Sequence, residues 1–379
     1  MSKPQNGAED PKVRFTEERA GRFAIGFIAL ENPRALNALD LPMLAAMGDK
    51  LIEWRGREEI ACIVLHSSSE RAFCAGGDVK SLALALGTPE GAAPAREYFT
   101  TEYFVDYLIH AYPKPILCWA DGITMGGGIG IMSGAARRIV TERTALAMPE
   151  VAIGLFPDVG ATYFLSRLPH RFGLFLGLTG GHFSGDDAVA LGMADGLARA
   201  EQKSAVLSGL RALAWSKDGQ ENRQTLGNFL AGFADPAVGA NSELWKRREA
   251  IERLMTGNTI EEIDRNLRSW SENDPLIARA IRGYSAGSPT SVKVVYQQLR
   301  SPTTLPLKDV FLREWDMAIG FCERSDFVEG VRARLIDKDN RPRWSPPALS
   351  AVRSAEIARY FSPHDAPHPL AEKFRAAGI

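Results

Sequence analysis

The sequence predicts an α/β protein whose strands lie in its first half and whose second half is helical. Two strand–turn–helix units occur within the first 150 residues, and a repeated order of this kind builds a layered core. Glycines gather where predicted strands end, and beyond about residue 200 the strand signals give way to long helical patterns. The chain has 379 residues, 45% hydrophobic and 24% charged, which excludes wholesale disorder and a disulfide-stapled mini-domain.

The first unit begins with a short apolar strand over residues 22–30, which Asn32-Pro33 ends. Apolar residues from Leu41 to Ile52 then follow helical spacing, with Asp40 as the N-cap. A buried strand over residues 61–67 (ACIVLHS) follows that helix. This order predicts one complete strand, helix and strand passage.

The second unit contains a strand over residues 115–122, a glycine-opened helix over 126–136 and a strand over 137–148. Residues 115–136 carry a single charge, so their length alone would suit a membrane span. They also hold six glycines and lack a basic flank, which favours a buried strand, turn and helix. Helices are predicted later over residues 205–216 and 307–323.

Four segments are expected along the chain. Residues 1–12 are polar, resemble neither a signal nor a transit peptide, and are expected to form a disordered tail. Residues 13–200 are expected to form the α/β core, 201–285 a helical segment without a motif, and 286–379 a C-terminal helical region. Ser288 opens a helix there as a cap, with proline at the first helical position. Four cysteines without CxxC or zinc spacing fit a reducing compartment, and we expect a cytoplasmic protein.

The formal net charge is −1, with 45 basic and 46 acidic residues, so we expect no nucleic-acid partner. An anionic ligand must therefore be met by a local arrangement of groups. A basic run between residues 331 and 343 is either a solvated helix end or a rim that faces phosphate. It contains Arg332, Arg334, Lys338, Arg341 and Arg343.

Two glycine clusters are candidates for binding a ligand through the backbone. Ala75-Gly76-Gly77-Asp78 follows an aromatic residue, and residues 126–128 follow a strand and enter a helix. Neither matches a phosphate loop or a dinucleotide fingerprint. Glycine allows close approach of a backbone N–H to a ligand, and two such groups converging on one carbonyl would form an oxyanion hole. The alternative is that both are tight turns.

Glu150 and Asp158 lie in a strongly apolar run, residues 147–160. Burying an ionised group is costly unless it is used or paired, so the two acids are candidates for acid–base or nucleophilic work. The alternative is that both lie on an exposed loop.

Two rival motifs are weaker. Residues 283–287 match the G-x-S-x-G pattern of serine hydrolases, but the preceding segment is helical in pattern, whereas the pattern requires a strand. We interpret them as a joint between helices. His364 and His368 are separated by Pro367 and no Glu follows the first, so a frayed end is favoured over a zinc site.

Taken in order, these pieces resemble the crotonase (enoyl-CoA hydratase/isomerase) superfamily. The motifs are ENPRALNALD (31–40), RAFCAGGDVK (71–80), ADGITMGGGIG (120–130) and AMPEVAIGLFPDVG (147–160). TEYFVDYLIHAYPKP and SDFVEGVRARLIDKDNRPRW resemble its 3-hydroxyisobutyryl-CoA hydrolase branch. The resemblance covers about residues 13–345 and implies a spiral of ββα turns followed by C-terminal helices.

The resemblance also implies site residues and an activity. The backbone N–H groups of Gly77 and Gly127 would form the oxyanion hole, Glu150 and Asp158 would be the catalytic acids, and Glu102 would contact the substrate. Further substrate-binding residues implied are Asn37, Ala75, Gly76 and Asp78. The reaction would be hydrolysis of 3-hydroxyisobutyryl-CoA to 3-hydroxyisobutyrate and CoA, in valine catabolism. Coenzyme A enters with the substrate, so no metal or other cofactor is expected.

One departure from the wider superfamily separates the possible reactions. Hydratases carry a glutamate in the helix after the glycines, where this chain has Ile129-Gly130. With Glu150 alone, hydration lacks a partner and thioester hydrolysis is favoured. The alternatives are a hydratase or isomerase using Glu150 for proton transfer, and a noncatalytic CoA-binding protein. The resemblance further implies a trimer or hexamer, unless the longer helical tail replaces those contacts. No membrane partner is expected.

Overall fold

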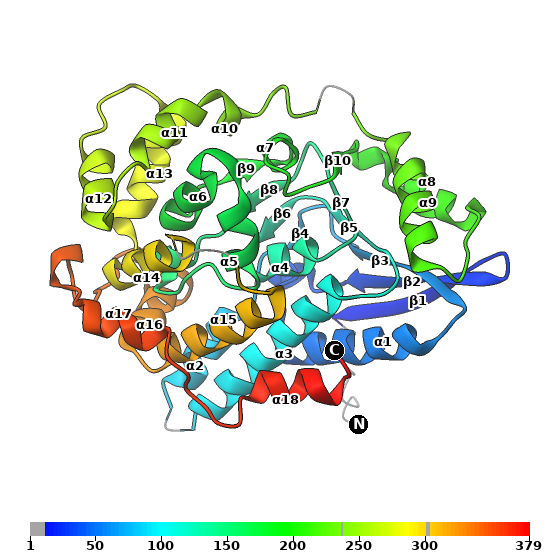
Figure 1. Ribbon diagram of the computed structural model, residues 1–379, viewed down its shortest axis with the longest axis horizontal. Helices are drawn as coiled ribbons and strands as arrows, with labels where there is room; N and C mark the ends of the chain where they lie inside the picture. Colours follow the sequence, from blue (N-terminus) through cyan, green and yellow to red (C-terminus); the bar gives the residue numbers. More distant parts are fainter. Residues whose placement is uncertain (1–11, 89, 236–237, 301–303) are drawn as a thin grey trace, which may run out of the picture.

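The computed structural model of the protein describes residues 12–88, 90–235, 238–300 and 304–379. The expected disordered tail therefore lies, except for residue 12, outside the described residues. Figure 1 shows the strands at the centre, with helices around them and the C-terminus near α1 and α18.

Two sheets make up the first half of the chain. The larger has the strand order β1-β2-β3-β5-β7-β10 and the smaller the order β4-β6-β8-β9. The strands are β1 (Val13–Ala20), β2 (Phe23–Leu30), β3 (Ile60–Ser67), β4 (Ala72–Cys74), β5 (Ile116–Ala120), β6 (Ile123–Met125), β7 (Arg137–Val140), β8 (Ala145–Ala147), β9 (Phe183–Ser184) and β10 (Gly196–Leu197). β3, β5 and β7 enter the larger sheet, and each is followed directly by a strand of the smaller one. The chain therefore advances as a spiral in which each turn adds one strand to each sheet.

The single strand expected over residues 137–148 is two strands, β7 and β8, that belong to different sheets. The turn between them is held by polar contacts. Thr141 Oγ1 donates to Asp121 Oδ1 at 2.6 Å, and Arg143 forms an ion pair with the same carboxylate. Asp121 is the one charge in residues 115–136, and it fixes a turn between sheets.

Strand β1 has no counterpart among the expected elements. It pairs antiparallel with β2 along its whole length and forms the edge of the larger sheet. Its sequence, VRFTEERA, is rich in charged residues, and most of its side chains are at least partly exposed. A half-exposed edge strand lacks the apolar run that marks the buried strands.

The helices of the first half are α1 (Leu41–Gly56), α2 (Val79–Leu86), α3 (Ala92–His110), α4 (Gly127–Ser133), α5 (Ala161–Phe164), α6 (Phe172–Thr179) and α7 (Gly185–Ala190). Asp40 caps α1 as expected, accepting a hydrogen bond from Met43 N at 2.9 Å. Residues 115–136 contain β5, β6 and the whole of α4, as expected for a buried strand, turn and helix. No helix in the described part of the chain combines the length and apolar character needed to cross a membrane.

The helices of the second half are α8 (Lys203–Gly209), α9 (Gly219–Ala231), α10 (Glu243–Lys246), α11 (Arg248–Leu254), α12 (Ile260–Arg268), α13 (Pro275–Ala286), α14 (Pro289–Arg300), α15 (Leu307–Cys322), α16 (Ser325–Val331), α17 (Ser354–Tyr360) and α18 (Pro369–Ala376). Ser288 caps α14 as expected, with Ser291 N donating to its hydroxyl. The helix expected over 205–216 is shorter: α8 ends at Gly209.

Residues 201–285 cover two different places on the core. Helices α8 and α9 lie beside β1, β2 and β3, whereas α10 to α13 lie on the opposite side, where α11 and α13 contact α6 (Figure 1). The apolar side chains of α8 and α9 pack with Phe27, Val64 and Trp119 of the larger sheet. Of these helices, only α13 lines the cavity described below.

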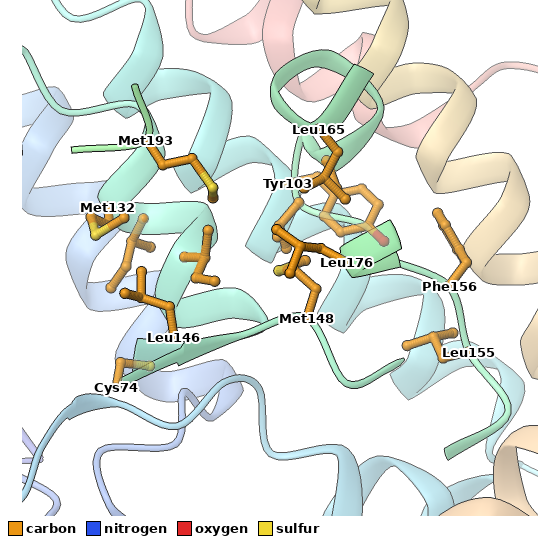
Figure 2. Packing of buried hydrophobic residues seen from close by; sticks show 14 of the residues in the cluster. Cys74, Tyr103, Met132, Leu146, Met148, Leu155, Phe156, Leu165, Leu176 and Met193 are labelled. Carbon is orange, nitrogen blue, oxygen red and sulfur yellow. The ribbon is translucent and has the colours of Figure 1, made fainter. Parts of the chain in front are cut away.

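The frayed C-terminal end is not observed. Helix α18 packs against α3, and Leu370 and Phe374 are fully buried. His364 N donates to Asp316 Oδ1 at 2.8 Å, which fixes the segment before α18. Figure 2 shows the interior, where Tyr103 of α3 lies among Leu165, Leu176 and Phe156.

Candidate active site

A cavity of about 1190 Å³ lies between the glycine clusters, α3 and α13. Its wall includes residues 75–77, the segment from Pro149 to Asp158, and residues of α6 and α13. Segments far apart in the sequence therefore meet around one space that is large enough for a sizeable small molecule.

Three carboxyl groups line this cavity. Glu102, Glu150 and Asp158 are 3%, 5% and 5% exposed. The exposed-loop alternative for Glu150 and Asp158 is therefore wrong. Acids buried this deeply in an apolar wall are expected at functional sites, where perturbed pKa values serve chemistry.

Glu150 opens a short 3-10 turn directly after Pro149. Its Oε2 is buried with no hydrogen-bond partner among the described residues. Its Oε1 lies 2.9 Å from the position that a Cβ on Gly126 would occupy. Burial, and then the charge of Asp158, raise the pKa of Glu150 well above its usual value. A buried carboxyl oxygen without a partner is available for a ligand or water in the cavity.

Asp158 is held by a tyrosine. Tyr103 donates from its hydroxyl to Asp158 Oδ2 at 2.6 Å. Burial raises the pKa of Asp158 to about 6, although the hydrogen bond from Tyr103 opposes that rise. The backbone turns sharply after it, since Val159 has φ 52° and Gly160 has φ 89°. Asp158 is thus oriented and can ionise near neutral pH.

Glu102 points into the cavity from the middle of α3. Its Oε1 lies 3.2 Å from the hydroxyl of Tyr98, which also lies 3.0 Å from Leu39 O. The same oxygen of Glu102 lies 2.7 Å from the position of a Cβ on Gly127. The carboxyl group is therefore beside the second glycine cluster.

The two glycine clusters lie against each other. A Cβ added to Gly127 would lie 3.3 Å from Gly77 N. A Cβ added to Gly76 would lie 3.7 Å from Gly127 N. The N–H groups of Gly77 and Gly127 have no acceptor among the described residues. Gly126 needs its glycine, because its φ of 49° and ψ of −123° are unsuited to a side chain. Two neighbouring free amides beside three acids can hold a developing negative charge.

The remaining expected binding residues divide into two groups. Ala75 and Gly76 line the cavity. Asn37 does not: it is fully buried, and its Nδ2 donates to Ser67 Oγ at 2.7 Å and to Phe73 O at 3.0 Å. Asp78 is also outside the wall and caps α2 by accepting from Ser81 N. Both hold the first glycine cluster in place.

Several residues of the site were not expected from the sequence. Tyr98 and Tyr103 are partners of the acids, and Asp106, one turn beyond Glu102, is fully buried with neither carboxyl oxygen bonded among the described residues. Glu314 of α15 accepts hydrogen bonds from Gly160 N at 2.6 Å and Thr162 N at 2.8 Å. A usable signal existed for α3: acids at positions 102 and 106 fall on the apolar face of a helical pattern.

Basic residues line the outer part of the wall. Arg279 and Arg282 are exposed on α13 and form no ion pair among the described residues, and Arg334 and His182 line the same cavity. Burial, and then the charge of Arg279, lower the pKa of His182. The basic run is divided: Arg332 pairs with Glu329, Asp337 and Asp339, whereas Arg334 reaches the cavity.

The rival motifs do not form sites. Ser285 is exposed in the last turn of α13, and the residues before it are helical, so no nucleophile elbow exists there. Among the residues that the structure describes, no group of three or more His, Cys, Asp or Glu is arranged to hold a metal ion.

The profile of the enoyl-CoA hydratase/isomerase family matches residues 25–361, and the chain belongs to that family. The expected crotonase-type spiral with a C-terminal helical region is thereby confirmed.

Curated relatives and solved structures extend the match over nearly the whole chain. The 3-hydroxyisobutyryl-CoA hydrolase, mitochondrial, of Gallus gallus is 36% identical, covering 89% of this chain and 86% of the relative. The Homo sapiens protein of the same name is 32% identical, covering 95% and 90%. A carnitinyl-CoA dehydratase from Mycobacterium thermoresistibile superposes with a TM-score of 0.82 at 32% identity, covering 94% and 98%. An enoyl-CoA hydratase from Rhodobacter sphaeroides 2.4.1 gives 0.81 at 32%, covering 94% and 99%.

Proposed function

We propose that the protein hydrolyses a short, branched 3-hydroxyacyl-CoA thioester, 3-hydroxyisobutyryl-CoA above all, to the free hydroxy acid and CoA. The observation that carries this proposal is the meeting of two free glycine amides and three buried carboxyls in one cavity. The names of the curated relatives support the substrate. Valine catabolism is the corresponding pathway.

In the proposed reaction, the N–H groups of Gly77 and Gly127 donate to the thioester carbonyl as negative charge develops on its oxygen. Glu150 either removes a proton from the attacking water or attacks the carbonyl carbon to form a mixed anhydride that water then cleaves. In both cases the carbon–sulfur bond breaks and the thiolate of CoA takes up a proton. Asp158, oriented by Tyr103, holds the water or the acyl hydroxyl.

Hydration of an enoyl-CoA is the second candidate, because both superposed crystal structures are of enzymes named for adding or removing water. Hydrolysis is favoured by the position after the glycines. A Cβ on Gly130 would lie 2.6 Å from Val159 Cβ, so no carboxylate can be carried there. Two assays distinguish hydrolysis from hydration. One measures thiol release from 3-hydroxyisobutyryl-CoA and 3-hydroxypropionyl-CoA, and the other measures loss of enoyl absorbance from crotonyl-CoA. Enoyl turnover without thiol release contradicts the proposal, and binding without either reaction indicates a noncatalytic CoA-binding protein.

The acids of the cavity wall are buried, whereas Arg279 and Arg282 of the same wall are exposed and form no ion pair among the described residues. This suits a ligand with a small acyl end that is buried and a phosphate-bearing end near the surface. We expect the double substitution of Arg279 and Arg282 by alanine to raise KM for the CoA thioester about 10- to 100-fold, because charge-assisted hydrogen bonds are lost. Steady-state kinetics with the CoA ester and with the pantetheine ester, which lacks the nucleotide phosphates, measure this effect.

The pantetheine ester should show no such rise. Arg265→Ala is the matched control, since Arg265 is an exposed arginine of the neighbouring helix α12 outside the cavity. Equal effects on both esters would show that α13 does not contact the phosphates.

A pH profile tests the role of Asp158. Its pKa of about 6 predicts that kcat/KM falls as the pH drops below that value, because the ionised form is lost. Tyr103→Phe removes the donor that lowers this pKa, so the acid limb should move to higher pH by about one unit. Tyr112→Phe is the control, since its buried hydroxyl bonds to Leu51 O away from the cavity. An unmoved limb in Tyr103→Phe would exclude Asp158 as the group that titrates.

Location, assembly and cofactor use are also proposals. We propose a cytoplasmic protein. Its four free cysteines fit a reducing compartment, and the curated relatives are named mitochondrial. Fluorescence microscopy of the tagged chain tests the location. We further propose that CoA enters only as part of the substrate, without a resident cofactor or a nucleic-acid or membrane partner. Self-association into a homo-oligomer remains a proposal that sedimentation decides.

A further inference from the structure

The hydrogen-bond geometry at Glu102 constrains where its proton lies. The Tyr98 hydroxyl has one hydrogen and two oxygen neighbours, Leu39 O at 3.0 Å and Glu102 Oε1 at 3.2 Å. A backbone carbonyl can only accept, so the shorter contact requires the tyrosine hydrogen. The contact between Tyr98 and Glu102 then needs a second hydrogen, which a protonated carboxyl group supplies.

The surroundings of Glu102 also disfavour a negative charge. Glu102 is buried beside Asp158, and no cation among the described residues acts on its charge. A hydrogen bond donated by Tyr98 to the carboxylate would lower the pKa of Glu102, but the single hydrogen of that hydroxyl has Leu39 O as its nearer acceptor. Burial, and then the charge of Asp158, raise the pKa of Glu102 well above its usual value. Five other titratable groups are packed around this part of the wall, and none of them is a cation. They are Tyr103 and Asp106 of α3, Cys74 of β4, Glu150 of the 3-10 turn after Pro149, and Glu314 of α15.

The second tyrosine of α3 is placed differently from Tyr98. Tyr103 donates its hydrogen to Asp158 Oδ2 at 2.6 Å and has no competing acceptor among the described residues. One helix therefore presents two tyrosines in different settings: among the described residues, Tyr103 has Asp158 Oδ2 as its acceptor, whereas Tyr98 has both Leu39 O and Glu102 Oε1 within reach. Opposite environments for two neighbouring acids assign them different roles.

We propose that Glu102 binds substrate as a neutral carboxylic acid: Tyr98 fixes its hydrogen on Oε1, and Oε2 accepts a hydrogen bond from the acyl hydroxyl. Oε2 has no bond to protein among the described residues, and Glu102 lines the cavity, so this oxygen is left for a ligand. Tyr98 is the positioning residue. The inference rests on the proposed function for the identity of the hydroxyl donor.

The sign of a pH shift tests the proton assignment. If substrate binding requires a neutral Glu102, kcat/KM for 3-hydroxyisobutyryl-CoA should fall at high pH as Glu102 ionises. Glutamine cannot ionise, so Glu102→Gln should abolish this basic limb of the profile. Tyr98→Phe removes the acceptor of the carboxyl hydrogen, so the limb should move to lower pH by about one unit. A limb that persists in Glu102→Gln, or that moves to higher pH in Tyr98→Phe, overturns the proposal, because the latter means that Tyr98 donates to a carboxylate.

A substrate that lacks the acyl hydroxyl tests whether Glu102 contacts that group. Glu102→Ala should lower kcat/KM for 3-hydroxyisobutyryl-CoA about 10- to 100-fold relative to its effect on isobutyryl-CoA, which lacks the hydroxyl. Equal losses on the two esters contradict contact between Glu102 and that group.

Infrared spectroscopy determines the protonation state of Glu102 in the absence of substrate. The difference spectrum between the native protein and Glu102→Gln should contain the C=O band of a protonated carboxylic acid, and carboxylate bands in its place overturn the proposal. If native protein releases no CoA from either ester, the proposed function fails, and this spectrum still decides the state of Glu102.

Discussion

Replacing Glu150 by glutamine is expected to abolish thiol release while leaving the fold at least as stable as that of the native chain. Glu150 is the carboxyl group that must act on water or on the carbonyl carbon, and loss of such a group lowers kcat by about 10²- to 10⁴-fold or more. Its Oε2 has no protein partner among the described residues, so no buried hydrogen bond to it is lost. Thiol-release kinetics and thermal unfolding of the same preparation measure both effects.

The stability effect has a definite sign. The pKa of Glu150 is raised in the folded state by burial, so the folded state binds the proton more tightly than the unfolded one. The native protein therefore loses stability as the pH rises from the usual glutamate pKa toward that raised value. Glutamine does not ionise, so Glu150→Gln should lack this loss and melt at or above the native temperature at alkaline pH. Near-normal thiol release by this variant would refute the proposed role of Glu150.

Gly127→Ala is expected to produce the second large loss. The added Cβ would lie 2.7 Å from Glu102 Oε1 and 3.3 Å from Gly77 N, so it would occupy the space between the two amides where the carbonyl oxygen is proposed to bind. Loss of one oxyanion donor costs about 10²- to 10³-fold in kcat, and we expect a reduction of that order in kcat/KM. Gly127 does not have a positive φ, so backbone strain does not explain the loss.

Gly56→Ala is the matched control. Gly56 ends α1, has no positive φ, and a Cβ there would meet no atom within 4 Å. Kinetics of both variants, with circular dichroism to compare their folds, separate a blocked site from a general effect of alanine. If Gly127→Ala keeps its native kcat/KM, the carbonyl does not bind between these amides.

Much of the fold could be predicted because its signals are local. The buried strands β2, β3 and β5 are continuous apolar runs, and the caps at Asp40 and Ser288 are short sequence patterns that form as expected. β1 and the division of residues 137–148 could not be predicted, since the first depends on pairing with β2 and the second on a turn fixed by Asp121. Both depend on partners outside the segment itself, which the pattern of that segment does not show.

The site was predictable in its chemical groups but not in its geometry. Glycine clusters and acids in an apolar run are visible in the sequence, and the resemblance assigned them roles. Asn37 shows the limit of assigning roles by resemblance. It matches a family motif for substrate binding, but its side chain is hydrogen-bonded to Ser67 and Phe73 and supports a loop. The arginines that α13 contributes to the cavity wall could not be predicted from the sequence. Their pattern is that of ordinary exposed charges on a helix, and only the fold places this helix against the cavity.

The sequence by itself determined the class of fold, the two glycine turns and the presence of acids too deeply embedded in apolar residues to be ordinary. These follow from local patterns of burial and backbone freedom, which act over a few residues. Only the tertiary structure decided which acid carries a proton. Tyr98 and Tyr103 lie on one helix, but their partners Leu39 and Asp158 come from opposite directions along the chain. Protonation depends on the distance to a partner and on exclusion of water, and both exist only after the chain has folded.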